Sequence, residues 1–114
     1  MKLIIDIGNT RNKLALFDGQ QIYSQCNIND ITLERVQEFV ANQNISATII
    51  SSVKDFDSQT LSVSDYYDAI ILSENTLIPI QNSYKTKDTL GKDRLASVVG
   101  AYFLYPGRDI IVFD

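Results

Sequence analysis

Two short stretches of the sequence combine residue types that could bind phosphate and move a proton. Asp6-Ile7-Gly8-Asn9-Thr10 ends an apolar run, and Leu90-Gly91-Lys92-Asp93-Arg94 opens a helical pattern. A glycine-containing turn can line a concave cradle for phosphate oxygens with its backbone amides, and a carboxylate can hold the Mg²⁺ that accompanies them. An acid can accept a proton from a substrate hydroxyl while a neighbouring arginine holds the substrate. The two stretches together are typical of a site for phosphoryl transfer.

Each stretch also has an ordinary structural interpretation. Asp, Gly and Asn dominate turns, so the first stretch could be a plain turn. Asp is a favoured helix N-cap, and Arg94 could be a solvated helix residue. The sequence contains no histidine, so any general base must be Asp, Glu, Lys or Tyr, which favours a chemical role for Asp93.

No standard nucleotide-binding loop is present. Gly91-Lys92 lacks both the upstream Gly and the following Ser or Thr of a Walker-type loop. If the chain binds nucleotide, it does so through a strand, a turn and a second strand, with Asp6 at the hinge.

The composition predicts one globular domain and a small anionic ligand. The 114 residues are 45% hydrophobic and 21% charged, which suits a chain that buries a core. The net charge of −4 argues against nucleic acid as a partner. The basic residues nevertheless gather in two patches: Arg11 and Lys13, then Lys85, Lys87, Lys92 and Arg94. The single cysteine, Cys26, excludes an internal disulfide and a thiolate zinc cluster.

The sequence shows neither a signal peptide nor an apolar run of membrane-spanning length. Only three apolar residues follow Met1-Lys2 before the first acid. These features predict a cytoplasmic protein without a membrane partner.

The hydrophobic pattern predicts an α/β fold. Apolar and alternating runs indicate three strands in a meander, at 2–5, 12–17 and 20–26. A helix capped by Thr32, a buried strand at 47–50, a weakly patterned helix within 58–67 and a buried strand at 69–72 follow. This order is typical of a mixed sheet with an antiparallel N-terminal meander, flanked by helices.

The last third contains an irregular loop and the clearest helix. Residues 74–88 predict an extended surface loop whose conspicuous residue is Tyr84. The helix that follows has a full apolar stripe at helical spacing and stops at Tyr105-Pro106-Gly107; the stripe is Leu95, Val98, Val99, Tyr102 and Phe103. Residues 110–113 then predict an apolar strand that ends in Asp114, as the first strand ends in Asp6.

Taken together, these pieces resemble the N-terminal half of a type III pantothenate kinase, of the acetate and sugar kinase and actin superfamily. The resemblance rests on Asp6-Ile7-Gly8-Asn9-Thr10, on the run from Tyr84 to Arg94 leading into Leu95-Ala96, and on the second acid-ended strand at Asp114. It spans nearly the whole chain in order. Lys87 departs from the pattern, since proline is expected there in much of the family.

The resemblance implies a ribonuclease H-like domain and ATP-dependent phosphorylation of the terminal hydroxyl of pantothenate, the first step of coenzyme A biosynthesis. It implies that Asp93 accepts the proton, and that Tyr84, Gly91, Lys92, Asp93 and Arg94 contact pantothenate. Asp6 would lie toward the Mg²⁺ of ATP, and Asp114 would match a ligand of K⁺ or NH4⁺. The residues implied to bind the nucleotide phosphates are Asp6, Ile7, Gly8, Asn9, Thr10, Arg11, Asn12 and Lys13.

The resemblance also implies a homodimer and a second domain. By this comparison residues 1–107 form the N-terminal domain, and 108–114 form the first strand of a similar domain that is otherwise missing. We therefore expect the 114-residue chain alone to be inactive, and the small-residue face around Gly100 is a candidate dimer contact. Two alternatives remain: a non-catalytic nucleotide-binding regulatory module, and a kinase of the same superfamily with another hydroxylated acid as substrate.

Overall fold

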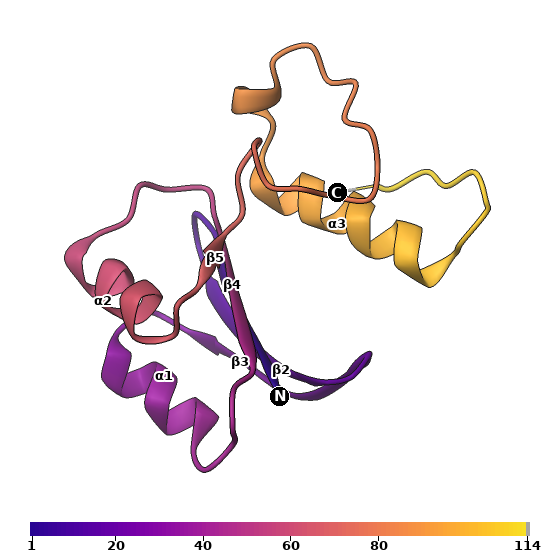
Figure 1. Cartoon of the computed structure of the whole chain (residues 1–114). Helices are drawn as coiled ribbons and strands as arrows, with labels where there is room; N and C mark the ends of the chain where they lie inside the picture. Colours follow the sequence, from indigo (N-terminus) through magenta and orange to yellow (C-terminus); the bar gives the residue numbers. More distant parts are fainter. Residues whose placement is uncertain (114) are drawn as a thin grey trace.

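The computed structural model describes residues 1–113, which form a five-stranded sheet with helices on both faces (Figure 1). Three helices and a short 3₁₀ turn connect or follow the strands. In chain order the elements are β1 (Lys2–Ile7), β2 (Asn12–Asp18), β3 (Gln21–Ile28), α1 (Leu33–Val40), β4 (Ala47–Ser52), α2 (Ser58–Tyr66), β5 (Ile70–Ile71), η1 (Lys87–Thr89) and α3 (Lys92–Leu104).

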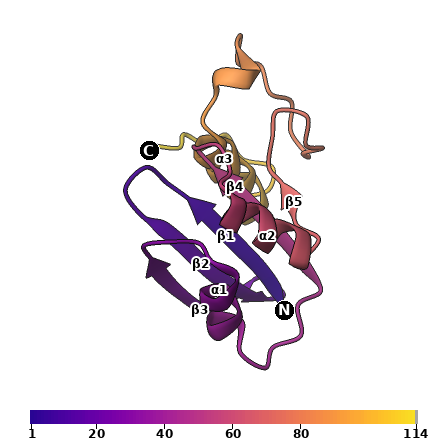
Figure 2. The ribbon, with the colours of Figure 1, turned by 90° about the vertical axis from the view of Figure 1, so that its left-hand side faces the viewer.

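The sheet has the strand order β3-β2-β1-β4-β5. The β1–β2 and β2–β3 pairs are antiparallel, whereas β4 pairs parallel with both β1 and β5. Helices α1 and α2 cover one face, and α3 lies on the other (Figures 1 and 2). The prediction of an α/β, ribonuclease H-like fold with an antiparallel N-terminal meander is confirmed.

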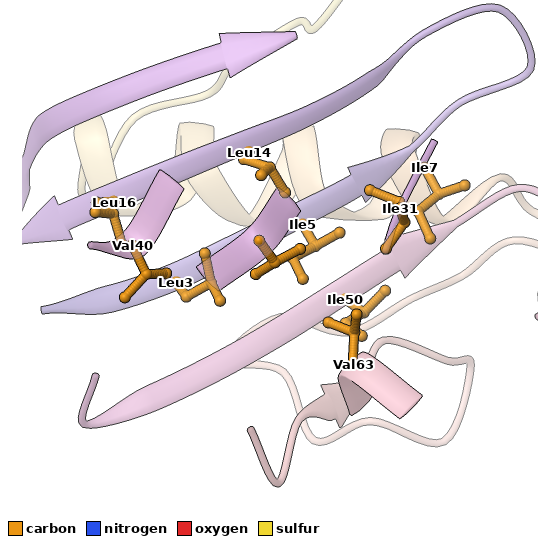
Figure 3. Packing of buried hydrophobic residues seen from close by; sticks show 10 residues of the cluster. Leu3, Ile5, Ile7, Leu14, Leu16, Ile31, Val40, Ile50 and Val63 are labelled. Atoms are coloured by element: carbon orange, nitrogen blue, oxygen red, sulfur yellow. The ribbon is translucent and has the colours of Figure 1, made fainter. Parts of the chain in front are cut away.

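The core lies between the sheet and the helices α1 and α2. Alternate residues of β1 and β2, together with Ile50 of β4, point into it, because side chains on a strand alternate between its faces. Figure 3 shows these side chains converging with residues from both helices. The cluster consists of Leu3, Ile5, Ile7, Leu14, Leu16, Ile31, Val36, Val40, Ile50 and Val63. Asp6, between two of these residues, is thereby placed on the opposite face.

Helix α1 begins and ends as its sequence predicts. The hydroxyl of Thr32 accepts a hydrogen bond from the backbone N–H of Arg35 at 3.3 Å, which satisfies a donor of the first turn. The helix ends at Ala41, whose positive φ of 51° turns the chain away. Helix α2 is capped in the same way by the carboxylate of Asp57, which accepts from the N–H of Thr60 at 2.8 Å.

The predicted buried strand at 69–72 is shorter and more exposed than expected. Only Ile70 and Ile71 form β5, and their side chains are 57% and 46% exposed. The prediction of burial was wrong because β5 is an edge strand of the sheet. Leu72 is buried, and its N–H donates to the carbonyl of Ile50.

The last helix has the predicted extent, but its apolar stripe is mostly uncovered. Leu95 is the buried member, while Val98, Tyr102 and Phe103 are 42%, 43% and 66% exposed. The predicted strand at 110–113 is not formed, since no strand in the described chain pairs with these residues. The predicted loop at 74–88 is confirmed, apart from the turn η1 that begins at Lys87. None of the described helices is long and apolar enough to span a membrane.

Candidate functional site

A tight turn joins β1 to β2 and contains the first predicted motif. The N–H of Gly8 donates to the carbonyl of Arg11 at 3.1 Å, which closes the turn. A Cβ at Gly8 would lie only 2.7 Å from that carbonyl oxygen, so the close approach of the two backbones requires glycine. Asn9 and Thr10 lie exposed at the tip, as does Arg11. Their backbone and side-chain groups are therefore accessible to an anion.

Asp6 and Lys13 are neighbours across the two strands that this turn connects. They are direct partners in the β1–β2 register, so both side chains lie on the same face of the sheet. Both line a hollow of about 490 Å³, together with Gln25 and Asn27 of β3. Asp6 is half-buried and Lys13 is exposed. A carboxylate, which can bind a metal ion, and an ammonium, which can bind phosphate oxygens, thus line one hollow.

Two of the residues predicted to bind nucleotide direct their side chains into the protein. Ile7 belongs to the core, and its carbonyl accepts from the N–H of Val53 at 3.0 Å. The side-chain amide of Asn12 donates to the carbonyl of Asn29 at 2.7 Å, which ties the turn to the end of β3. These residues hold the turn in place, and Ile7 can meet a ligand only through its backbone.

The second motif forms the start of α3. Gly91 is the N-cap, and Asp93 lies in the first turn of the helix. The Oδ1 atom of Asp93 accepts from the N–H of Arg94 at 2.9 Å. A Cβ at Gly91 would lie 2.5 Å from this same oxygen, so glycine leaves the space that the carboxylate takes. Asp93 therefore lies at the N-terminal end of α3, where the partial positive charge of the helix favours a carboxylate.

Lys92 is held by the loop that precedes it. Its ammonium lies 2.9 Å from Oε2 of Glu74, and its side chain is 17% exposed. The hydrogen bond from Lys92 lowers the pKa of the Glu74 carboxyl. Lys92 therefore ties the loop to the start of α3, and a substrate would have to compete with Glu74 for its charge.

Tyr84 and Arg94 meet in a second hollow, of about 390 Å³. Tyr84 is 49% exposed, and its N–H donates to Oδ1 of Asn82 at 3.0 Å. The wall also contains Ser97, whose hydroxyl donates to the carbonyl of Asp93 at 2.9 Å. The structure thus brings together an aromatic ring and a guanidinium that the sequence predicted as substrate contacts. The structure also places Asn82 and Ser97 in this hollow, and neither was predicted from the sequence. The spacing of four residues between Asp93 and Ser97, one helical turn, is the signal that could have indicated Ser97.

The two hollows are separate in this structure, and neither is the largest one. A hollow of about 850 Å³ lies at the opposite end of β4, between the last turns of α1 and α2. It contains none of the residues predicted for the site. Residues 1–113 hold no cluster of three or more Cys, Asp or Glu side chains that could bind a metal ion by themselves. Asp114, predicted to bind K⁺ or NH4⁺, lies outside the described residues.

Comparison with known proteins gives one consistent family. The family model described as type III pantothenate kinase matches residues 2–114. Relatives of that name from Phocaeicola vulgatus, Bacteroides fragilis strain YCH46 and Flavobacterium johnsoniae are 37%, 34% and 31% identical to the chain. Each alignment covers 100% of this chain and 48% of the relative. The chain spans about half the length of the relatives it matches.

Proposed function

The chain belongs to the type III pantothenate kinase family, and from that premise we propose that it supplies one half of a pantothenate kinase site. The reaction is transfer of the terminal phosphoryl group of ATP to the terminal hydroxyl of pantothenate, giving 4'-phosphopantothenate. The observation that carries this proposal is the pairing of Asp6 with Lys13 beside the glycine-closed turn.

The first hollow suits the phosphates of ATP. The exposed Arg11 and Lys13 offer positive charge, and the turn at 8–11 offers backbone amides at its tip. Asp6 fits Mg²⁺, because this ion takes one or two carboxylates and completes its shell with water and phosphate oxygens. Bound there, Mg²⁺ would offset the negative charge of the transferring phosphoryl group.

The start of α3 suits pantothenate. Arg94 offers a planar fork of donors for a carboxylate, and Tyr84 adds an aromatic wall in the same hollow. Asp93 is the group that would accept the proton of the attacking hydroxyl. This transfer requires that ATP and pantothenate bind at the same time, with the phosphates of ATP near Asp6 and the hydroxyl of pantothenate near Asp93.

The relatives contain a further stretch, about as long as this chain, that the 114 residues do not match. Since the chain spans 48% of the length of its relatives, we propose that the 114-residue chain does not catalyse the reaction by itself. The full protein is proposed to act in the cytoplasm as a homodimer, with the small-residue face around Gly100 as a contact. Asp114 is proposed to bind the K⁺ or NH4⁺ ion.

Release of ADP tests the proposal directly. The chain extended through its reading frame to the stop codon is assayed with ATP, Mg²⁺, K⁺ and pantothenate, beside the 114-residue chain. We expect pantothenate-dependent ADP release from the extended protein and none from the 114-residue chain. An Asp93→Asn variant should lose about 100-fold or more in kcat, because it removes the proton acceptor. Asp65→Asn, an exposed carboxylate on α2, is the matched control and should keep wild-type kcat.

One observation favours a second candidate function, that of a non-catalytic nucleotide-binding module. Asp93 and Lys92 are both engaged within the protein, with the Arg94 amide and with Glu74. If nucleotide binds but ADP release never depends on pantothenate, this module is the better conclusion. A panel of sugars and short hydroxylated acids in the same assay then separates it from a kinase with another substrate. Equal activity of the short and extended chains would contradict the need for the second half.

A further inference from the structure

Ser51, at the carboxyl end of β4, has a buried hydroxyl without a hydrogen-bond partner among the described residues. The residue is 7% exposed. A buried polar group with no partner is costly, and in native proteins it calls for an explanation. The position of Ser51 in the sheet supplies one.

Ser51 lies beside Asp6. The two residues are direct partners in the parallel β1–β4 register, on strands about 4.8 Å apart. Paired positions on neighbouring strands share a face, so both side chains lie on the face opposite the core cluster. Lys13 occupies the equivalent position on β2, on the other side of Asp6. Lys13, Asp6 and Ser51 therefore form a row across three strands, with the carboxylate in the middle.

Neighbouring hydroxyls show that this placement is specific. The hydroxyl of Ser52, the next residue, donates to the carbonyl of Lys54 at 2.8 Å and accepts a hydrogen bond from the N–H of Lys54 at 3.1 Å. Both of these hydrogen bonds belong to the local turn. Thr48 also has a buried hydroxyl without a partner in the described chain, but it pairs with Leu3 and faces the core side. Of these three hydroxyls, only that of Ser51 lies beside Asp6.

We propose that Ser51 is a positioning residue for Asp6. When Mg²⁺ and nucleotide are bound, its hydroxyl would donate to one carboxylate oxygen of Asp6 and leave the other oxygen for the metal ion. Carboxylates that bind metal ions are commonly oriented by such a donor. This inference rests on the proposed function, since it requires a metal ion at Asp6. It adds a residue from a third strand to a site that the first motif places on β1 and β2.

Magnesium dependence of ADP binding tests the role of Ser51. In the extended protein, ADP is titrated by calorimetry at a series of Mg²⁺ concentrations. Ser51→Ala should raise the Mg²⁺ concentration for half-maximal effect by about 10-fold, the lower end of the typical loss for a partner that orients a metal ligand. Ser51→Thr keeps the hydroxyl and should stay close to wild type. Thr48→Val removes a buried hydroxyl from the same strand and should leave the Mg²⁺ response unchanged.

Thermal unfolding separates positioning from a structural role. In the absence of Mg²⁺ and nucleotide, Ser51→Ala removes a buried hydroxyl that has no partner among the described residues, so its unfolding midpoint should equal or exceed that of the wild type. A lower midpoint with an unchanged Mg²⁺ response would overturn the inference, because the hydroxyl would then serve only the fold.

An Asp6→Asn variant distinguishes the two proposals. If Asp6→Asn loses the Mg²⁺ response and Ser51→Ala keeps it, the role of Ser51 is refuted while the metal site stands. If Asp6→Asn itself responds to Mg²⁺ as the wild type does, the metal site at Asp6 fails, and the proposed function fails with it.

Discussion

Replacing Gly8 with alanine tests whether a close backbone approach holds the turn after β1. An alanine Cβ would lie 2.7 Å from the carbonyl oxygen of Arg11, and ordinary contact begins near 3.4 Å, so the turn must open by about 0.7 Å. The same oxygen accepts the N–H of Gly8 at 3.1 Å. Opening the turn therefore weakens this hydrogen bond and displaces the exposed tip.

The expected cost follows from these two effects. Forcing a methyl group into a packed site costs about 1–3 kcal/mol, and weakening one hydrogen bond adds up to about 1 kcal/mol. We expect Gly8→Ala to lower the free energy of unfolding by about 2–3 kcal/mol in urea denaturation. Gly100→Ala, measured on the 114-residue chain, is the matched control: nothing lies within 4 Å of a Cβ added at this position in the interior of α3, so the substitution should raise stability by about 1 kcal/mol.

Two results would refute this reasoning. If Gly8→Ala unfolds at the wild-type urea concentration while Gly100→Ala stabilises as expected, the turn does not depend on the close approach. If Gly8→Ala is destabilised but the extended protein binds ADP with wild-type affinity, the turn is structural and does not cradle the phosphates.

Three further predictions concern stability and are measured on the 114-residue chain. Leu3→Ala should cost about 2–5 kcal/mol in urea denaturation, because Leu3 is fully buried in the core. Thr32→Ala should cost about 1 kcal/mol by the same measurement, through loss of the cap of α1. Lys92 lowers the pKa of Glu74 in the folded chain, so their contact stabilises above the ordinary carboxyl pKa of 4.5 and is lost as the pH falls below it. The difference in unfolding midpoint between wild type and Glu74→Gln should therefore be present at neutral pH and vanish in acid.

The sequence pattern predicted those features that are determined by residues close together in the chain. The apolar run at 2–5 and the alternation at 12–17 are enough to identify two strands, and the residues between them identify the turn. Thr32 predicted the start of α1 because a cap bonds an amide only three residues away. The prediction that Asp6 lies where β1 meets the turn needed no more than this.

Features that depend on distant parts of the chain were not predictable in the same way. The stripe on α3 indicates a helix with one apolar face, but periodicity does not say what covers that face. Residues 110–113 have the composition of a strand, yet a strand also requires a partner for its backbone. Ser51 could not be singled out, because its place beside Asp6 depends on the register of β1 and β4, whose paired residues are far apart in sequence.

The register of β1 links the stability of the sheet to the chemistry of the site. Ile5 and Ile7 flank Asp6, and both belong to the core cluster. A slip of β1 by one residue would move these isoleucines to the opposite face of the sheet and carry the carboxylate into the core, where an unpaired charge is strongly disfavoured. The same alternation that buries Ile5 and Ile7 therefore keeps Asp6 between Lys13 and Ser51. A substitution that weakens the burial of either isoleucine should disturb the site as well as the fold.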